Sequence, residues 1–89
     1  MIYRHKNKRG HRCEAVQFLG PDSVEDIRVT FGIRIKYDPE SAALYFQDGQ
    51  IIERGDYAVA SIGGFFVVCK TAEWFEARWL PAYEQGELF

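Results

Sequence analysis

The stretch AALYFQDGQIIERG, residues 42–55, decides how this chain folds. It places Asp48-Gly49 between two apolar runs, which is the strongest short-range signal of a β-hairpin. Arg54-Gly55-Asp56 overlaps its end, where Gly permits a positive φ and the Asp side chain can bond neighbouring backbone amides. We interpret this tripeptide as a turn rather than as an adhesion motif, which would need an exposed loop and an extracellular location.

Further strand patterns lie on both sides of this hairpin. Alternating apolar residues predict strands in RCEAVQFLG (12–20), IRIKY (33–37), YAVAS (57–61) and FFVVCK (65–70). Gly63-Gly64 separates the last two runs and predicts a second hairpin turn. The pair lacks the residue spacing of a phosphate-binding loop and lies between strands rather than before a helix.

Two segments carry helix signals. In PDSVEDIRVTFG (21–32), Ser23 and Asp26 have the spacing of a capping box, and Gly32 stands where a C-cap is expected. In TAEWFEARW (71–79), Thr71 can cap a short helix that Leu80-Pro81 ends.

The resulting order, β-α-β-β-β-β-α, predicts an α+β fold. We expect a small, partly curled antiparallel sheet of about five strands with one or two short helices packed against it. The 89 residues, 47% of them hydrophobic, predict a single domain, with residues 1–12 as a basic N-terminal arm and residues 80–89 as a C-terminal tail. No apolar run approaches the ~20 residues of a membrane span, and the start lacks the apolar segment of a signal peptide. We therefore expect a cytoplasmic protein without membrane contact.

Charge is distributed unevenly along the chain. Residues 1–12 carry five basic residues and no acidic one, whereas residues 13–89 hold the other six basic and all thirteen acidic residues. A basic arm on an acidic body suits contact with nucleic acid or with an anionic ligand, although the arm could equally lie on the acids of its own body. The pI of about 5.6 argues against a globally basic nucleic-acid-binding face.

Catalytic and metal-binding patterns are weak. Cys69 precedes a predicted helix and neighbours Lys70, which can lower a thiol pKa, but the only candidate bases, His5 and His11, lie in the arm. The spacing of His5, His11 and Cys13 matches no common zinc pattern. Both cysteines are interpreted as small core hydrophobes. We therefore expect no catalytic residue, no metal and no cofactor, and we predict that the protein is not an enzyme.

Aromatic residues exceed what a core of this size needs. The surplus, which could line a groove or an oligomer interface, comprises Tyr3, Tyr45, Phe46, Tyr57, Phe65, Phe66, Trp74 and Trp79. Cations near such rings would bind phosphates while the rings stack on bases. The predicted ligand-binding residues are Arg4, Lys8, Arg9, Arg12, Arg34, Lys36, Tyr57 and Trp74.

Several short motifs follow one another along the chain: Glu14-Ala15-Val16-Gln17-Phe18, Gly55-Asp56-Tyr57, Gly64, Phe65, Cys69-Lys70, Phe75-Glu76 and Trp79. Their order resembles that of a widespread family of small bacteriophage and prophage proteins. The chain departs from the family pattern where Arg54 replaces a Pro, Phe65 replaces a Glu and Val67-Val68 replaces Tyr-Pro. The resemblance implies a phage accessory protein acting in the cytoplasm of a bacterial host, and it transfers no catalytic residue.

Three functions follow as hypotheses. The first is a non-enzymatic, homo-oligomeric anti-defence protein that sequesters an anionic ligand such as a nucleotide immune signal. The second is an inhibitor that binds a host defence protein or nucleic-acid enzyme, through its acidic body or through a sheet edge. The third is a nucleic-acid-binding accessory protein that uses the basic arm.

Overall fold

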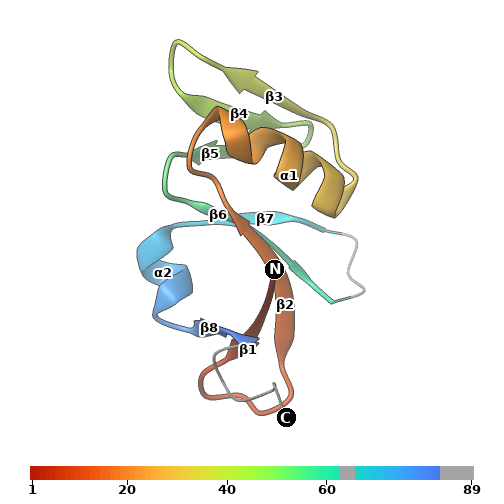
Figure 1. Cartoon of the computed structure of the whole chain (residues 1–89), viewed down its shortest axis with the longest axis vertical. Coiled ribbons are helices and arrows are strands. Elements are labelled where there is room, and N and C mark those ends of the chain that lie inside the picture. The colour runs from red at the N-terminus through yellow and green to blue at the C-terminus, as the bar shows by residue number, and fades with distance from the viewer. Residues whose placement is uncertain (63–65, 83–89) are drawn as a thin grey trace.

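The computed structural model describes residues 1–62 and 66–82, which form an elongated molecule of 43 × 23 × 20 Å. Figure 1 shows α1 and β3–β5 at one end of the long axis and β1 and β8 at the other. The elements are β1 (Ile2–His5), β2 (Arg12–Gln17), α1 (Pro21–Phe31), β3 (Ile35–Asp38), β4 (Ala43–Phe46), β5 (Ile51–Glu53), β6 (Tyr57–Ser61), β7 (Val68–Lys70), α2 (Ala72–Glu76) and β8 (Trp79–Pro81).

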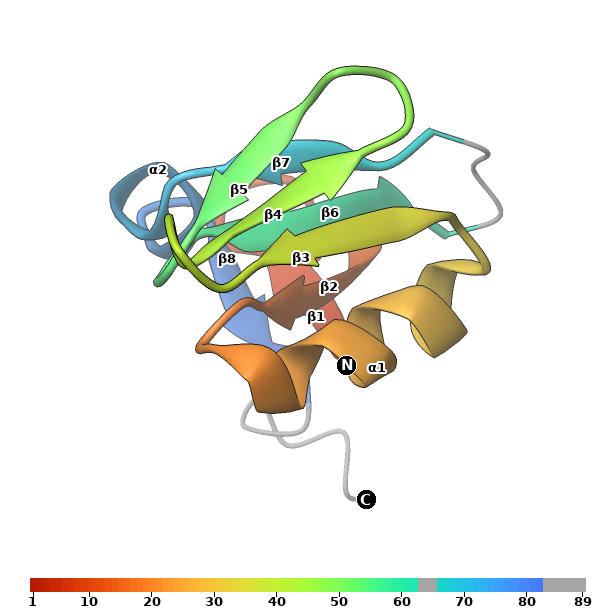
Figure 2. The ribbon, with the colours of Figure 1, turned by 90° about the horizontal axis from the view of Figure 1, so that it is seen from above.

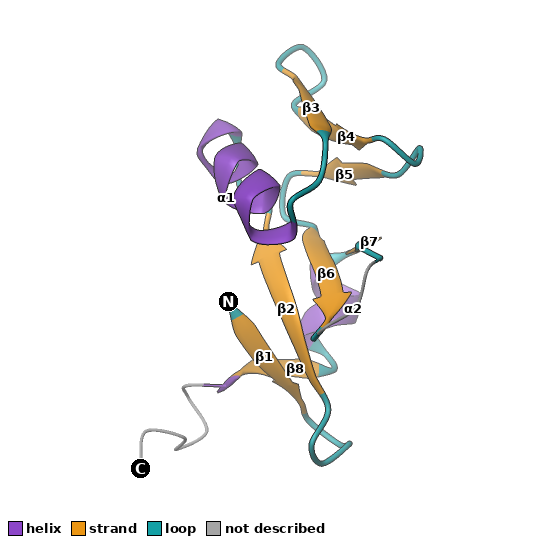
Figure 3. Cartoon of the chain, turned by 90° about the vertical axis from the view of Figure 1, so that its right-hand side faces the viewer, coloured by secondary structure: helices purple, strands orange, loops and turns teal. Residues whose placement is uncertain are grey.

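The predicted α+β class is confirmed, with more strands than expected and in two open sheets rather than one. The larger sheet has the order β7-β6-β2-β1-β8 and the smaller one the order β3-β4-β5, and all neighbouring strands are antiparallel. Strand β2 runs from the loop after β1 to the vicinity of α1 (Figure 3). It therefore connects the two ends of the molecule.

The turns predicted around Asp48-Gly49 and Arg54-Gly55-Asp56 are confirmed. Strands β4 and β5 pair with Tyr45 opposite Ile51, and Gly49 between them has φ +95°. Gly55 has φ +100°, and the Asp56 carboxylate accepts a hydrogen bond from the Glu53 amide at 3.1 Å. The predicted Gly63-Gly64 turn lies outside the described residues, although β6 and β7 on either side of it are paired antiparallel.

Helix α1 begins earlier than the capping-box prediction required. Pro21 occupies its first turn and Gly20 is the N-cap, so Ser23 lies inside the helix. The Ser23 hydroxyl accepts a hydrogen bond from the Leu19 amide at 2.9 Å instead of capping from the N-cap position. The capping-box prediction is therefore wrong. The C-cap prediction is confirmed, because Gly32 is left-handed (φ +63°) and its amide bonds Arg28.

Two hydrophobic clusters stabilise the two ends of the molecule. In Figure 2, α1 lies along one side of the strands, and α2 lies apart from it at one end of the strands. The first cluster contains Val16, Phe18, Ile27, Leu44, Phe46, Ile52 and Ala58. The second contains Cys13, Ala15, Tyr57, Val59 and Phe75, with Tyr3, Ala72 and Trp79 packed against it. The second cluster holds β1, β8 and α2 in place.

The N-terminal segment is anchored in the larger sheet, because residues 2–5 form β1 and Arg12 begins β2, with residues 6–11 as the loop between them. Strand β1 pairs with β2 on one side and with β8 on the other, with Tyr3 opposite both Cys13 and Pro81. The reason is aromatic packing, since the Tyr3 ring meets the Phe75 ring edge to face at 4.9 Å.

The C-terminal elements also differ from the prediction. Thr71 caps α2 as predicted, by accepting a hydrogen bond from the Trp74 amide at 3.2 Å. The helix ends at Glu76, so Trp79–Pro81 forms strand β8 and only the later part of the predicted tail, residues 83–89, lies outside the described residues.

Candidate functional site: a basic surface around the β1–β2 loop

The loop between β1 and β2 carries a dense group of cations and has a defined backbone. The His5 amide donates to the His11 carbonyl at 2.9 Å, and the His11 amide donates to the Lys8 carbonyl at 3.1 Å. The Lys6 amide bonds the Arg78 carbonyl at 2.8 Å, which ties the loop to the segment after α2. A hollow of about 420 Å³ is lined by Arg4, His5, Lys6, Asn7, Arg9, Gly10, His11 and Arg12.

The segments on either side of α2 add two further cations, Lys70 from the end of β7 and Arg78 from the segment after the helix. The Arg78 guanidinium lies 4.3 Å from the centroid of the Trp74 ring, and the Lys70 ammonium lies 4.5 Å from it. Arg78 also donates to the Trp74 carbonyl at 3.0 Å. These cation–π contacts hold both cations near the helix surface.

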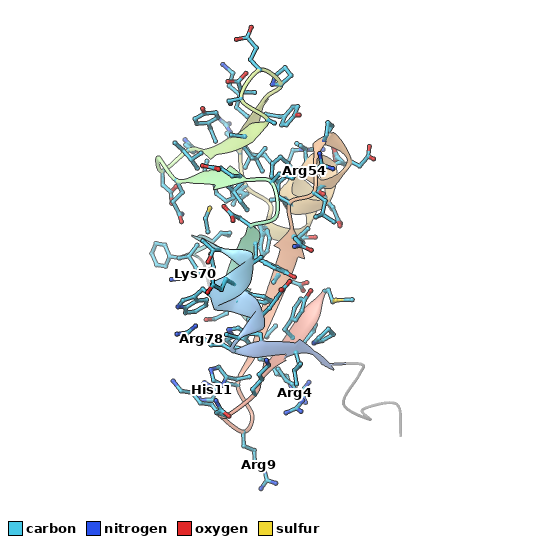
Figure 4. The ribbon with its side chains drawn as sticks, turned by 90° about the vertical axis from the view of Figure 1, so that its left-hand side faces the viewer. Arg4, Arg9, His11, Arg54, Lys70 and Arg78 are labelled. Atoms are coloured by element: carbon cyan, nitrogen blue, oxygen red, sulfur yellow. The ribbon has the colours of Figure 1, made fainter. Side chains whose placement is uncertain are left out.

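Figure 4 shows Lys70, Arg78 and His11 along one side of the molecule, with Arg9 at the tip of the loop and Arg54 far away near α1. We call the resulting set of cations the basic surface. It consists of Arg4, Lys6, Lys8, Arg9, Arg12, Lys70 and Arg78. The basic surface therefore holds seven of the eleven Lys and Arg residues of a chain whose net charge is −2.

His5 lies at the centre of this surface. Its Nδ1 accepts hydrogen bonds from the amides of Asn7 (3.0 Å) and Lys8 (3.1 Å). Its ring meets the Trp79 ring edge to face at 4.9 Å. Partial desolvation, together with the positive charges of Lys8, His11 and Arg78, lowers the pKa of His5 below its ordinary value of 6.5.

The structure brings together five of the eight predicted ligand-binding residues. Arg4, Arg9 and Arg12 line the hollow, Lys8 belongs to the same loop, and Trp74 is 36% exposed beside Arg78.

The other three predicted ligand-binding residues lie elsewhere. Tyr57 is only 5% exposed, stacks on Phe75 and donates to the Glu76 carboxylate at 2.8 Å, so it is a core residue. Arg34 and Lys36 are exposed, but they lie just before and within β3, at the opposite end of the molecule. The eight predicted ligand-binding residues therefore do not all lie together.

The prediction of surplus surface aromatics does not hold for four of the eight rings. Phe46 and Tyr57 are buried, and Tyr3 and Trp79 are half-buried against the second cluster. Tyr45, Phe66 and Trp74 are exposed. The predicted contribution of Phe65 lies outside the described residues. Packing in the second cluster accounts for Tyr3, Tyr57 and Trp79, and packing in the first cluster accounts for Phe46.

The two thiols are suited to a core rather than to reaction. Burial raises the pKa of Cys13 to about 12, with a smaller effect from Glu14. Burial raises the pKa of Cys69 to about 11, with Asp48 and Asp56 acting in the same direction. Cys69 packs against the first cluster, so its position beside Lys70 does not lower its pKa. Over residues 1–62 and 66–82, no cluster of three His, Cys, Asp or Glu side chains is placed to hold a metal ion.

A second hollow lies at the other end of the molecule. It has a volume of about 360 Å³ and combines apolar side chains with Arg34 and Asp48. Its lining residues are Gly32, Ile33, Arg34, Phe46, Gln47, Asp48, Phe66 and Val67. With one cation and one carboxylate, it is less suited to a polyanion than the basic surface.

Lys6, Lys70, Arg78 and His5 were missing from the predicted ligand-binding set. Lys6 lies in the basic segment that the sequence singled out, whereas Lys70 and Arg78 flank α2 and are brought together by their contacts with Trp74. The role of His5 had no sequence signal, since it depends on the course of the loop backbone.

Comparison with models of known protein families, with curated proteins and with solved structures finds no match for this chain. Neither α1 nor α2, the helices of the described residues, combines the length and apolar character that a membrane crossing requires.

Proposed function

We propose that the protein is a non-enzymatic binder of single-stranded nucleic acid, which it holds through the basic surface. The observation that supports this proposal is the grouping of Arg4, Arg9 and Arg12 around one hollow at the end of the molecule, with Arg78 and Lys70 continuing along one side toward its middle. Arg and Lys side chains neutralise backbone phosphates and release their counterions, which supplies most of the affinity of sequence-independent binding.

The shape of the basic surface favours an extended ligand. The cations follow the side of the molecule from Lys70 through Arg78 to Arg9 at the loop tip (Figure 4). Such a strip can contact successive phosphates of one strand, and the partly exposed Trp74 ring holds two of its cations, Lys70 and Arg78, in place.

A free nucleotide is the second candidate ligand. The hollow of about 420 Å³ is within the size range of small-ligand sites and is lined by three arginines. Under this alternative the protein would sequester a nucleotide immune signal and would act as a phage anti-defence protein in a bacterial host. We favour the polymer because Lys70 and Arg78 extend the cations beyond the hollow.

The experiment is fluorescence anisotropy of a labelled single-stranded oligonucleotide, measured against the full chain over a series of salt concentrations. The logarithm of the affinity should fall linearly with the logarithm of the salt concentration, with a slope of about −0.7 per phosphate contacted. Replacing Arg9 and Arg12 together with alanine should weaken binding and make the slope shallower by up to about 1.4.

A matched control removes the same charge from the other end. The double variant Arg34→Ala/Lys36→Ala loses two exposed cations, one just before β3 and one within it. It should bind the oligonucleotide as the unmodified protein does. Equal weakening by both double variants would contradict a site at the β1–β2 loop. A competing mononucleotide that displaces the oligonucleotide at equal concentration would favour the sequestration alternative.

A further inference from the structure

His5 organises the β1–β2 loop through a single ring nitrogen. Its Nδ1 accepts two backbone hydrogen bonds, from Asn7 at 3.0 Å and from Lys8 at 3.1 Å. The His5 backbone amide bonds the His11 carbonyl at the other end of the loop. The side chain of His5 therefore holds the start of the loop, and its main chain holds the end of the loop.

This arrangement requires one tautomer. A nitrogen that accepts from amides carries no proton, so the His5 proton lies on Nε2 and the ring is neutral. Protonation of Nδ1 would set its N–H against the N–H groups of Asn7 and Lys8, and both hydrogen bonds would be lost. The neutral ring is thus a structural component of the loop.

The groups around His5 oppose its protonation. Lys8 from the loop, His11 from the approach to β2, and Arg78 from the segment between α2 and β8 all act on it as positive groups. Trp79 of β8 supplies an uncharged ring at 4.9 Å. Each of the elements packed against His5 thus favours the neutral acceptor.

We propose that His5 is a positioning residue that holds the cationic β1–β2 loop in its binding shape, and that protonation of His5 releases this loop. The loop-holding role stands on the hydrogen bonds alone, whereas its effect on ligand binding rests on the proposed function. The sign follows from linkage. The unfolded loop gains a proton more readily than the ordered one, so order in the loop decreases as the pH falls below 6.5, the ordinary pKa of histidine.

Two variants separate the acceptor from the ring. His5→Asn keeps an acceptor that bonds a backbone amide two residues further on, but it does not titrate. His5→Phe keeps a ring to pack on Trp79 but has no acceptor. His11→Asn removes the other histidine while keeping the described hydrogen bonds of residue 11, which are made by its main chain. Because His11 also acts on His5 as a positive group, this variant should move the His5 titration to higher pH and keep the loss of loop order that accompanies it.

The experiment is NMR of the full chain without ligand. At pH 7 the His5 nitrogens should show the tautomer protonated at Nε2, and the Asn7 and Lys8 amides should be protected from hydrogen exchange. Acidification through the His5 titration should reduce these protection factors by about fivefold in the unmodified protein and in His11→Asn. The reduction should be absent in His5→Asn, and His5→Phe should lack the protection at every pH.

A proton on Nδ1 at pH 7, or protection in His5→Phe equal to that in the unmodified protein, would overturn the proposal. Oligonucleotide binding is then compared between the unmodified protein and His5→Asn at pH 7 and pH 5. The affinity ratio of the two proteins should shift in favour of His5→Asn at pH 5, because their other titrating groups are the same. If the NMR results are as expected but the protein binds no oligonucleotide, the loop role of His5 is supported and the proposed function is refuted. Failure of the His5 proposal and failure of the proposed function therefore give different results.

Discussion

Replacing Phe75 with alanine removes the side chain at the centre of the second cluster. Phe75 is fully buried, and its ring stacks on Tyr57 at 4.2 Å and meets Tyr3 edge to face at 4.9 Å. A buried Phe→Ala change costs about 3–5 kcal/mol through lost transfer energy and the cavity that remains. The total stability of a domain is only about 5–15 kcal/mol, so this single change removes a large share of it.

The consequence extends to the basic surface, because Phe75 is the buried residue of α2. The neighbouring Trp74 holds Lys70 and Arg78 by cation–π contacts, and loosening the helix removes the support of both cations. We therefore expect Phe75→Ala to weaken oligonucleotide binding as well as stability, even though Phe75 has no exposed surface with which to contact a ligand.

The assay is urea unfolding followed by circular dichroism and tryptophan fluorescence. Phe66→Ala makes the same chemical change at a ring that is 85% exposed, and it should alter the free energy of unfolding by no more than about 0.5 kcal/mol. Phe75→Leu keeps most of the volume and should cost less than about 1.5 kcal/mol, so it provides a measurable value if Phe75→Ala does not fold. Equal losses for Phe75→Ala and Phe66→Ala would refute the assignment of Phe75 to the core.

Two further predictions concern the interior of the second cluster and the thiols. Tyr57→Phe removes the hydrogen bond to the partly solvated Glu76 and should cost about 1 kcal/mol; a double-mutant cycle with Glu76→Ala, which removes the acceptor, should recover a similar coupling energy, and zero coupling would contradict the bond. Because burial raises the pKa of Cys13 to about 12 and that of Cys69 to about 11, both should react slowly with iodoacetamide at pH 8 and faster as the pH rises or urea is added. Fast labelling of Cys69 in the native protein at pH 8 would show instead an activated thiol.

The sequence predicts the local elements of this fold better than their assembly. The Asp48-Gly49 turn, the Gly32 C-cap and the Thr71 N-cap are each determined by a few neighbouring residues, and all three are confirmed. Strands β1 and β8 were not predicted, because they are short and pair with each other from opposite ends of the chain. Their pairing depends on the tertiary contact of Tyr3 with Phe75, which no local pattern reports.

For the candidate site too, the sequence predicts what neighbouring residues determine and misses what long-range contacts determine. The cations of residues 4–12 were predictable because five of them lie within one short segment without acids. The position of these cations beside Lys70 and Arg78 depends on the backbone hydrogen bond between Lys6 and Arg78, which is a long-range contact. Tyr57 was misassigned because an aromatic residue in an alternating strand looks the same whether its face is covered by a helix or open to solvent.

Chemical-shift mapping by NMR tests most directly whether the basic surface binds nucleic acid. An unlabelled single-stranded oligonucleotide is added to the isotopically labelled full chain at low salt, and the amide and side-chain signals are followed. We predict that the largest shifts fall on residues 4–12 and on Lys70, Trp74 and Arg78, and that they disappear at high salt. Shifts centred on Arg34 and Lys36, or no shifts at all, would contradict the account.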